Sequence, residues 1–210
     1  MKQIKLIILF LFFLPLVTTN AQENKKIRVA CIGNSITFGY GIKDRIKDAY
    51  PEQLSRMLGD GYEVKNFGIS GRTLLSKGNA PYIETQAYKD ALAYNPDIVI
   101  IKLGSKDFNW IYKDGFETDY LQLLESFQNL TSKPTVYPCL AVPVYEKGRK
   151  ISAEIVTNEV NPKIREIAKK QGLKLIDLYT PMLGKGHLFP DAIHPNGEGA
   201  GEIAKIIFEN

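Results

Sequence analysis

Two short segments, far apart in the chain, contain residue types that could perform acyl transfer together. An apolar run ends at residues 33–37 (Gly-Asn-Ser-Ile-Thr), which place a serine, Ser35, on a tight turn at the expected start of a helix. A serine in this setting is a candidate nucleophile, because helix backbone N–H groups can stabilise developing negative charge. Ser35 could equally serve only as the cap of that helix.

The base that such a serine requires must be one of two histidines. A serine hydroxyl is a weak nucleophile until an imidazole takes its proton, and a carboxylate can orient that imidazole. His194 follows Asp191 by three residues, in a loop that precedes the last expected helix. His187 lies in a glycine-containing segment, 184–187, which is typical of a flexible turn. The spacing favours His194 as the base and Asp191 as its partner.

A parallel sheet is the element expected to position these residues. Apolar runs alternate with segments of helical pattern, which indicates a sheet covered on both faces. Ligands of such sheets bind beyond the carboxyl ends of the strands. The expected strands are Ile27–Ile32, Tyr62–Phe67, Asp97–Leu103, Thr135–Val142 and Leu173–Leu178. The expected helices are Pro51–Leu58, Thr85–Tyr94, Asp119–Leu130, Ala153–Gln171 (kinked or split by Pro162) and a last helix from Asn196 to the C-terminus.

Two more polar turns follow expected strands at the same edge. Residues 66–72 (Asn-Phe-Gly-Ile-Ser-Gly-Arg) come after the second strand, and residues 104–107 (Gly-Ser-Lys-Asp) come after the third. Glycine in such a turn lets the backbone approach a ligand closely. Either turn alone is a common feature of α/β proteins.

Taken together, these segments resemble the SGNH (GDSL) hydrolase superfamily. Residues 33–37, Gly68, residues 104–107 and residues 191–194 have the order and spacing of its four sequence blocks, over about residues 26–209. The first and last blocks are most similar to those of bacterial exported carbohydrate acetylesterases. The resemblance implies an α/β fold, a three-layer αβα sandwich of flavodoxin-like type, with five parallel strands in the order 2-1-3-4-5. It implies Ser35 as nucleophile, His194 as general base and then acid, and Asp191 as its orienting carboxylate.

The same resemblance implies an oxyanion hole, in which this chain departs from the family. The backbone N–H groups of Ser35 and Gly68 would be joined by an asparagine side chain of the third block, but Lys106 stands there. Loss of one such donor costs about 10²–10³ in turnover. Lys106 could turn its ammonium to the oxyanion, or it could turn to solvent or to an acid and leave a slower enzyme, with Asn109 as a substitute donor. The third alternative is a protein that has lost hydrolysis and kept ligand binding.

Specificity is expected from loops 70–88, 108–116 and 144–152. The candidate substrate contacts are Arg72, Trp110 and Tyr145, and the same loops contain Tyr82 and Tyr112. Trp110 could as well cover the core. With no long apolar surface segment to form an acyl tunnel, a short acyl group, acetate above all, is favoured. We therefore expect a serine esterase acting on short-chain acyl esters of carbohydrate. The alternatives are a lipase or lysophospholipase-type acyl hydrolase, and a catalytically impaired carbohydrate-binding protein.

The first residues have the pattern of a secretory signal peptide. Lys2 and Lys5 precede an apolar run over 6–17, and a short polar stretch leads to Ala21. We expect cleavage near Ala21, which leaves residues 22–210 as a single SGNH hydrolase domain in the periplasm or outside the cell. The alternative is an uncleaved N-terminal anchor. Beyond residue 21 no run is long enough for a membrane span.

Charge and cysteine content exclude further classes of function. The net charge is +4, and loss of Lys2 and Lys5 with the signal peptide leaves +2, so nothing favours a nucleic-acid partner. Cys31 and Cys139 lie in strands expected two positions apart, too far for a disulfide, so we expect two free buried thiols. Two cysteines and two histidines are too few for a convincing zinc site, and we expect no metal and no cofactor. The expected partner is a small-molecule or polysaccharide acyl ester.

Overall fold

A parallel four-stranded sheet forms the centre of the computed structural model, which describes residues 25–107, 110–145 and 151–210. The strands run side by side in the order β2-β1-β3-β4. They are β1 (Ile27–Gly33), β2 (Tyr62–Gly68), β3 (Ile98–Lys102) and β4 (Thr135–Pro138). The first four expected strands and their parallel arrangement are confirmed. The expected signal peptide (residues 1–21) lies outside the described residues.

The expected fifth strand, Leu173–Leu178, is wrong as a regular strand. It forms one isolated bridge, in which Ile176 pairs with Cys139. Ile176 donates to the carbonyl of Pro138 (2.9 Å) and accepts from the N–H of residue 140 (3.0 Å). Continuing this ladder toward residue 174 would require an N–H on residue 138, and proline has none. The fourth strand ends at Pro138, short of the expected Val142, and the order is 2-1-3-4 where five strands were expected.

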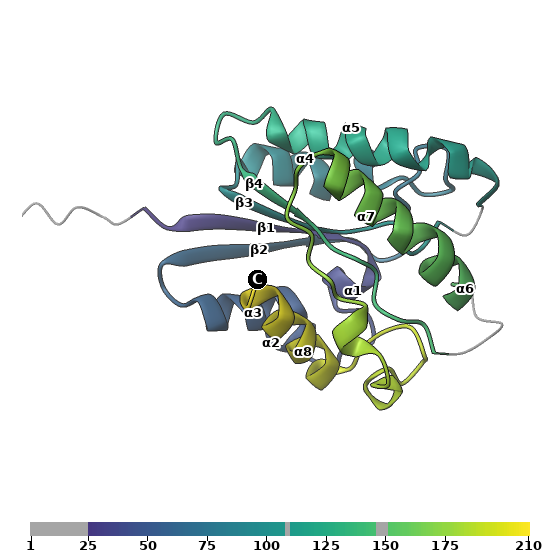
Figure 1. The fold of residues 1–210 in the computed structure, drawn as a ribbon. Helices are drawn as coiled ribbons and strands as arrows, with labels where there is room; N and C mark the ends of the chain where they lie inside the picture. Colours follow the sequence, from purple (N-terminus) through teal and green to yellow (C-terminus); the bar gives the residue numbers. More distant parts are fainter. Residues whose placement is uncertain (1–24, 108–109, 146–150) are drawn as a thin grey trace, which may run out of the picture.

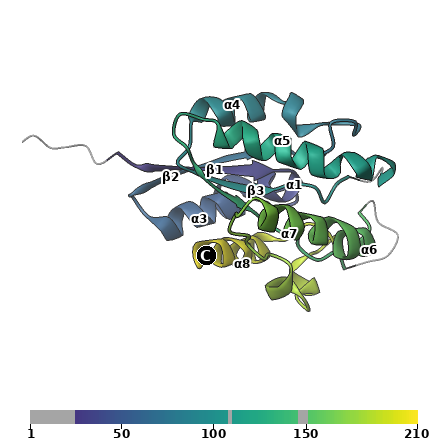
Figure 2. The same cartoon turned by 45° about the horizontal axis from the view of Figure 1, so that its top comes forward.

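Helices cover both faces of the sheet, as Figures 1 and 2 show. One face packs against α4 (Gln86–Tyr94), α5 (Phe116–Gln128) and α7 (Asn161–Lys170). The other face packs against α3 (Tyr50–Leu58) and α8 (Gly197–Phe208). The result is a three-layer αβα arrangement. The shorter elements are α1 (Ser35–Phe38), α2 (Arg45–Asp48), α6 (Ala153–Ile155) and the 3₁₀ turns η1 (Tyr82–Glu84), η2 (Trp110–Gly115), η4 (Thr180–Met182) and η5 (Gly186–Leu188).

The helix expected over Ala153–Gln171 is interrupted. A π-helical turn, η3 (Val156–Val160), joins α6 to α7, and Pro162 lies in the first turn of α7. Proline has no N–H with which to make the usual hydrogen bond to the carbonyl one turn earlier. The widened π-helical turn before Pro162 accommodates this missing hydrogen bond. The last helix begins where expected, since the Asn196 side chain accepts from the Gly199 N–H at 2.8 Å and caps α8.

Both cysteines are free and buried, as expected from their strand positions. Burial raises the pKa of both thiols, that of Cys139 to about 12, so neither is a reactive thiolate. Among the described residues no helix has the length and hydropathy to cross a membrane.

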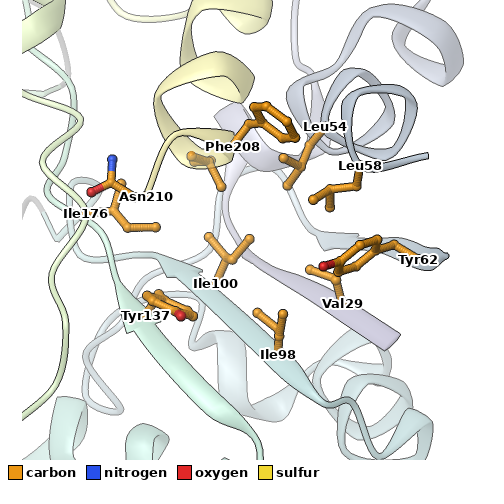
Figure 3. A pocket seen from close by; sticks show the side chains of 11 residues that line it. Val29, Leu54, Leu58, Tyr62, Ile98, Ile100, Tyr137, Ile176, Phe208 and Asn210 are labelled. Carbon is orange, nitrogen blue, oxygen red and sulfur yellow. The ribbon is translucent and has the colours of Figure 1, made fainter. Parts of the chain in front are cut away.

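An apolar cavity of about 140 Å³ lies between the sheet and the ends of α3 and α8 (Figure 3). Val29 and Ile98 contribute from the early parts of β1 and β3, and Leu58 and Phe208 from the last residues of α3 and α8. These positions place the cavity at the amino ends of the strands. The turn that bears Ser35 follows the carboxyl end of β1, at the opposite edge.

Candidate active site

Ser35 is the first residue of α1 and follows β1 directly. The turn needs glycine at position 33, because a β-carbon there would lie 2.7 Å from the Lys102 carbonyl oxygen and 2.1 Å from Thr37 Oγ1. Asn34 occupies the cap position, so Ser35 is not the cap of this helix. The Ser35 hydroxyl instead contacts a histidine from the far end of the chain.

The structure brings Ser35, His194 and Asp191 into one hydrogen-bonded series. His194 Nε2 lies 2.9 Å from Ser35 Oγ across 159 residues of sequence. His194 Nδ1 lies 2.6 Å from Asp191 Oδ2. Both distances lie within hydrogen-bond range for a nucleophile, its base and an orienting acid. Ser35 is 8% exposed, so the hydroxyl is largely shielded from solvent.

The charge state of Asp191 determines which nitrogen of His194 carries the proton. Burial raises the pKa of Asp191, but hydrogen bonds from the His194 ring and from the N–H groups of Ile193 (3.0 Å) and His194 (2.7 Å) outweigh it and lower the pKa below its usual value. The ionised carboxylate can only accept, so Nδ1 must donate to it. In a neutral ring Nε2 is then the acceptor, free to take the serine proton.

The ring of Tyr40, a residue that no sequence motif singles out, packs on this histidine. The ring centroids of Tyr40 and His194 lie 4.6 Å apart, with the planes inclined at 50°. The Tyr40 N–H donates to the Ser35 carbonyl at 2.9 Å, which fixes the tyrosine on the turn that follows α1. Nothing in the local pattern marks Tyr40, because its contact depends on the return of the last loop.

Lys106 points at the loop that follows β2. Its Nζ donates to the Gly71 carbonyl at 2.8 Å, and the side chain is half-buried. Gly71 has φ 83°, a left-handed conformation that favours glycine. The alternative in which Lys106 turns to solvent is therefore not observed. The proposed substitute donor, Asn109, lies outside the described residues.

The expected oxyanion donor Gly68 makes a different contact. Its N–H donates to Asn66 Oδ1 at 3.0 Å, so it has an acceptor within the protein. A β-carbon on Gly68 would lie 2.3 Å from the Phe38 nitrogen. Glycine at this position therefore lets the end of β2 pack closely on α1, and its part in an oxyanion hole stays a prediction.

Two buried polar residues hold the surrounding turns in place. The Asp107 carboxylate, 4% exposed, accepts from the N–H groups of Leu75 (2.8 Å) and Leu74 (3.3 Å). Burial raises the pKa of Asp107 to about 6, although these two hydrogen bonds act in the opposite direction. Asn34 Nδ2 lies 3.5 Å from Ser105 Oγ and links the first and third segments. Both residues belong to polar turns recognised in the sequence, but no sequence pattern predicted the hydrogen bonds that they make.

The expected substrate contacts have different fates. Tyr82 is fully buried and its hydroxyl donates to the Phe67 carbonyl at 2.7 Å, so its place among the specificity loops is wrong and it belongs to the core. Arg72 is half-buried. The side chain of Trp110, in η2, lies outside the described part of the structure.

Tyr145 packs against the loop that contains His194. Its hydroxyl donates to the Met182 carbonyl, its N–H donates to the Ala192 carbonyl at 3.0 Å, and its ring lies 5.1 Å from that of Phe189. These contacts favour a supporting role for Tyr145 over the expected substrate contact. Within the described residues no cluster of three or more histidine, cysteine, aspartate or glutamate side chains could hold a metal ion.

Comparison with known proteins gives a family match over most of the chain. Residues 31–201 match the GDSL-like lipase/acylhydrolase family. The acetylxylan esterase of Xylanibacter ruminicola is 42% identical in an alignment that covers 89% of this chain and 43% of that protein. The chain thus spans less than half the length of this relative.

Solved structures share the fold at low sequence identity. An acetyl xylan esterase, AlAXEase, matches with a TM-score of 0.66 and 22% identity, over 87% of this chain and 98% of that chain. A two-domain esterase active on acetylated mannans, co-crystallised with mannopentaose, matches with a TM-score of 0.65 and 22% identity, over 88% of this chain and 49% of that chain. These likenesses establish the fold.

Proposed function

The chain belongs to the GDSL-like lipase/acylhydrolase family, and from this premise we propose that it is a serine esterase that removes short acyl groups, above all O-acetyl groups, from carbohydrate. The single observation that carries the proposal is the series Asp191–His194–Ser35, with contacts of 2.6 and 2.9 Å. The relative named as an acetylxylan esterase supports the choice of substrate.

The proposed reaction has two steps. Ser35 Oγ attacks the acyl carbon while His194 Nε2 takes its proton, and the imidazolium then protonates the departing sugar oxygen as the ester bond breaks. Water next attacks the acyl-serine, gives a proton to His194, and the acid leaves as the proton returns to Ser35. Asp191 holds the ring in the required tautomer and stabilises the imidazolium.

The oxyanion of each tetrahedral intermediate requires preorganised donors. We assign this role to the Ser35 N–H and the Lys106 ammonium, which the Gly71 carbonyl holds at the edge of the sheet. A lysine at this point supplies a full positive charge where the family has a neutral amide. Gly68 joins this set once its N–H exchanges Asn66 for the substrate oxygen.

The apolar cavity is not a candidate channel for a long acyl chain bound at Ser35. A long acyl chain whose carbonyl sits at Ser35 would need an apolar channel at the carboxyl edge. The cavity of about 140 Å³ lies at the amino ends of the strands, beneath α3 and α8, where such a chain would not reach (Figure 3).

We further propose that residues 22–210 form one domain, exported after removal of residues 1–21.

The test compares wild type with Ser35→Ala on p-nitrophenyl esters of increasing chain length and on acetylated xylan. Wild type should prefer acetyl esters and release acetate from xylan, and Ser35→Ala should fall to background. Ser126→Ala, a serine on α5 whose hydroxyl bonds the Leu123 carbonyl, is the matched control and should keep full activity. A fluorophosphonate probe should label wild type at Ser35.

Three outcomes would contradict the proposal. Activity that survives Ser35→Ala would exclude this nucleophile. A preference for long acyl chains would favour the lipase-type alternative. Absence of both turnover and probe labelling, in folded protein, would favour a binding protein without hydrolysis.

A further inference from the structure

A hollow of about 380 Å³ lies between the loop that follows β2 and the start of α5. The loop contributes Ser76 and Lys77, and the helical side contributes Tyr112, Thr118 and two carboxylates. Both segments follow strands that end at the edge where Ser35 stands: the loop comes after β2, and η2 and α5 come after β3. Figure 1 shows α5 beginning toward the end of the sheet at which α1 lies.

The wall formed by the loop is fixed by buried or half-buried carboxylates. The Ser76 N–H and hydroxyl both donate to Asp119, at 2.7 and 3.0 Å. One residue earlier, the Leu75 N–H donates to the buried Asp107 at 2.8 Å. A loop tied at two successive residues is ordered before a ligand arrives, so little conformational entropy remains to be lost on binding.

The lining combines one aromatic residue with mixed polar groups. Tyr112 is 38% exposed, at the start of the helical wall. Around it lie the hydroxyl of Thr118, the carboxylate of Asp114 and the ammonium of Lys77, all exposed. Carboxylates accept hydrogen bonds from hydroxyl groups, ammonium groups donate to them, and an aromatic ring packs against C–H surface. Opposite charges in one hollow disfavour a strongly charged ligand.

A pyranose ring has the complementary surface, because it presents C–H groups on its faces and hydroxyl groups around its rim. We propose that this hollow, named here the Tyr112 hollow and defined by Ser76, Lys77, Tyr112, Asp114, Thr118 and Asp119, binds sugar units of a polysaccharide chain away from the ester being cleaved. This inference rests on the proposed function and specifies its substrate as a polymer.

The Tyr112 hollow is connected to the reacting residues through one loop. The loop that carries Ser76 begins after β2, and its Gly71 carbonyl accepts from Lys106 at 2.8 Å. Lys106 and Asp107 are adjacent, and both hold this loop, at Gly71 and at Leu75. A polysaccharide with one acetylated unit at Ser35 would thus have further units placed over a surface that is rigidly joined to the catalytic edge.

The test separates binding of the polymer from ester cleavage. Tyr112→Ala should raise KM for acetylated xylan about tenfold, which corresponds to about 1.4 kcal/mol for the loss of one stacked ring, and leave kcat and KM for p-nitrophenyl acetate unchanged. Tyr112→Phe keeps the ring and should behave as wild type on both substrates. Phe208→Ala, another half-exposed aromatic but at the opposite edge, is the matched control and should leave KM for the polymer unchanged.

A direct binding measurement distinguishes failure of this inference from failure of the proposed function. Isothermal titration with unacetylated xylohexaose should show binding by wild type and about tenfold weaker binding by Tyr112→Ala, whether or not the protein hydrolyses esters. If Tyr112→Ala has the wild-type KM for acetylated xylan, or if the two proteins bind the hexaose equally tightly, sugar binding in the Tyr112 hollow is excluded. Neither result would contradict the esterase proposal. Hexaose binding lost in Tyr112→Ala, in a protein with no turnover, would support the hollow and reject the esterase.

Discussion

Replacing the buried Lys102 with methionine is expected to stabilise the protein in a pH-dependent way. Lys102 ends β3, pairs with Gly33 in the sheet, and is 2% exposed. Its Nζ has no hydrogen-bond partner among the described residues. Burying an ammonium without hydrogen bonds to replace those to water destabilises the folded state. Burial accordingly lowers the pKa of Lys102 from 10.5 to about 8.

The magnitude and the sign follow from this shift. Each pKa unit corresponds to about 1.4 kcal/mol, so a shift from 10.5 to about 8 amounts to roughly 3 kcal/mol. Between pH 8 and 10.5 the unfolded chain binds a proton at Lys102 that the folded chain does not, so this residue makes the free energy of unfolding rise with pH across that window. Methionine has similar length and no charge. The stability advantage of Lys102→Met should therefore be greatest below pH 8 and shrink by roughly 3 kcal/mol toward pH 10.5.

Urea unfolding of both proteins at several pH values between about 7 and 10 measures this difference. Buried acids such as Tyr50 and Cys31 have raised pKa values and act in the opposite direction as pH rises, but they are present in both proteins and largely cancel in the comparison. Lys89→Met, at an exposed position on α4, is the control and should give a small difference that does not vary with pH. A Lys102→Met advantage that is the same at pH 7 and pH 10 would refute the reasoning.

Substitutions at two positions test the proposed chemistry. Asp191→Asn should lower kcat by about 10³–10⁴ with the fold intact, because an amide can donate to Nδ1 and favour the wrong ring tautomer. Steady-state kinetics together with thermal unfolding check this, and a loss below tenfold would exclude Asp191 as the orienting acid. Lys106→Met, which removes the charge and keeps the length, should lower kcat by about 10²-fold, and Lys106→Asn should lose less because it keeps an N–H donor. Wild-type kcat in Lys106→Met would remove the lysine from the oxyanion hole.

The sequence was sufficient for features that depend on local pattern. Runs of β-branched and apolar residues such as those around Ile98 and Val99 predicted four strands of the sheet, and the asparagine ahead of α8 marked the helix start. The serine of the first turn and the acid and histidine of the last loop could be singled out because each belongs to a short segment with recognisable chemistry. Although these residues are far apart in the sequence, they could be predicted to meet, because the carboxyl ends of parallel strands lie at a common edge.

Contacts between segments were decided by the tertiary structure alone. The fifth strand is reduced to a bridge at Ile176 because Pro138, the last residue of the neighbouring β4, has no N–H to donate. Tyr82 is a core residue because β2 offers its hydroxyl a carbonyl acceptor. Lys106 has its position because the Gly71 carbonyl lies within its reach.

The difference has a physical origin. Hydrophobic periodicity and turn chemistry act over a few residues, so they can be read from consecutive positions of the chain. The partner of a particular N–H, ammonium or hydroxyl is chosen by what the fold brings within about 3 Å, and many side chains could satisfy the same group equally well. The sequence therefore predicted which residues are candidates to react and where four strands lie. Only packing determined that His194 contacts both Ser35 and Tyr40, and that Lys106 turns to the loop after β2.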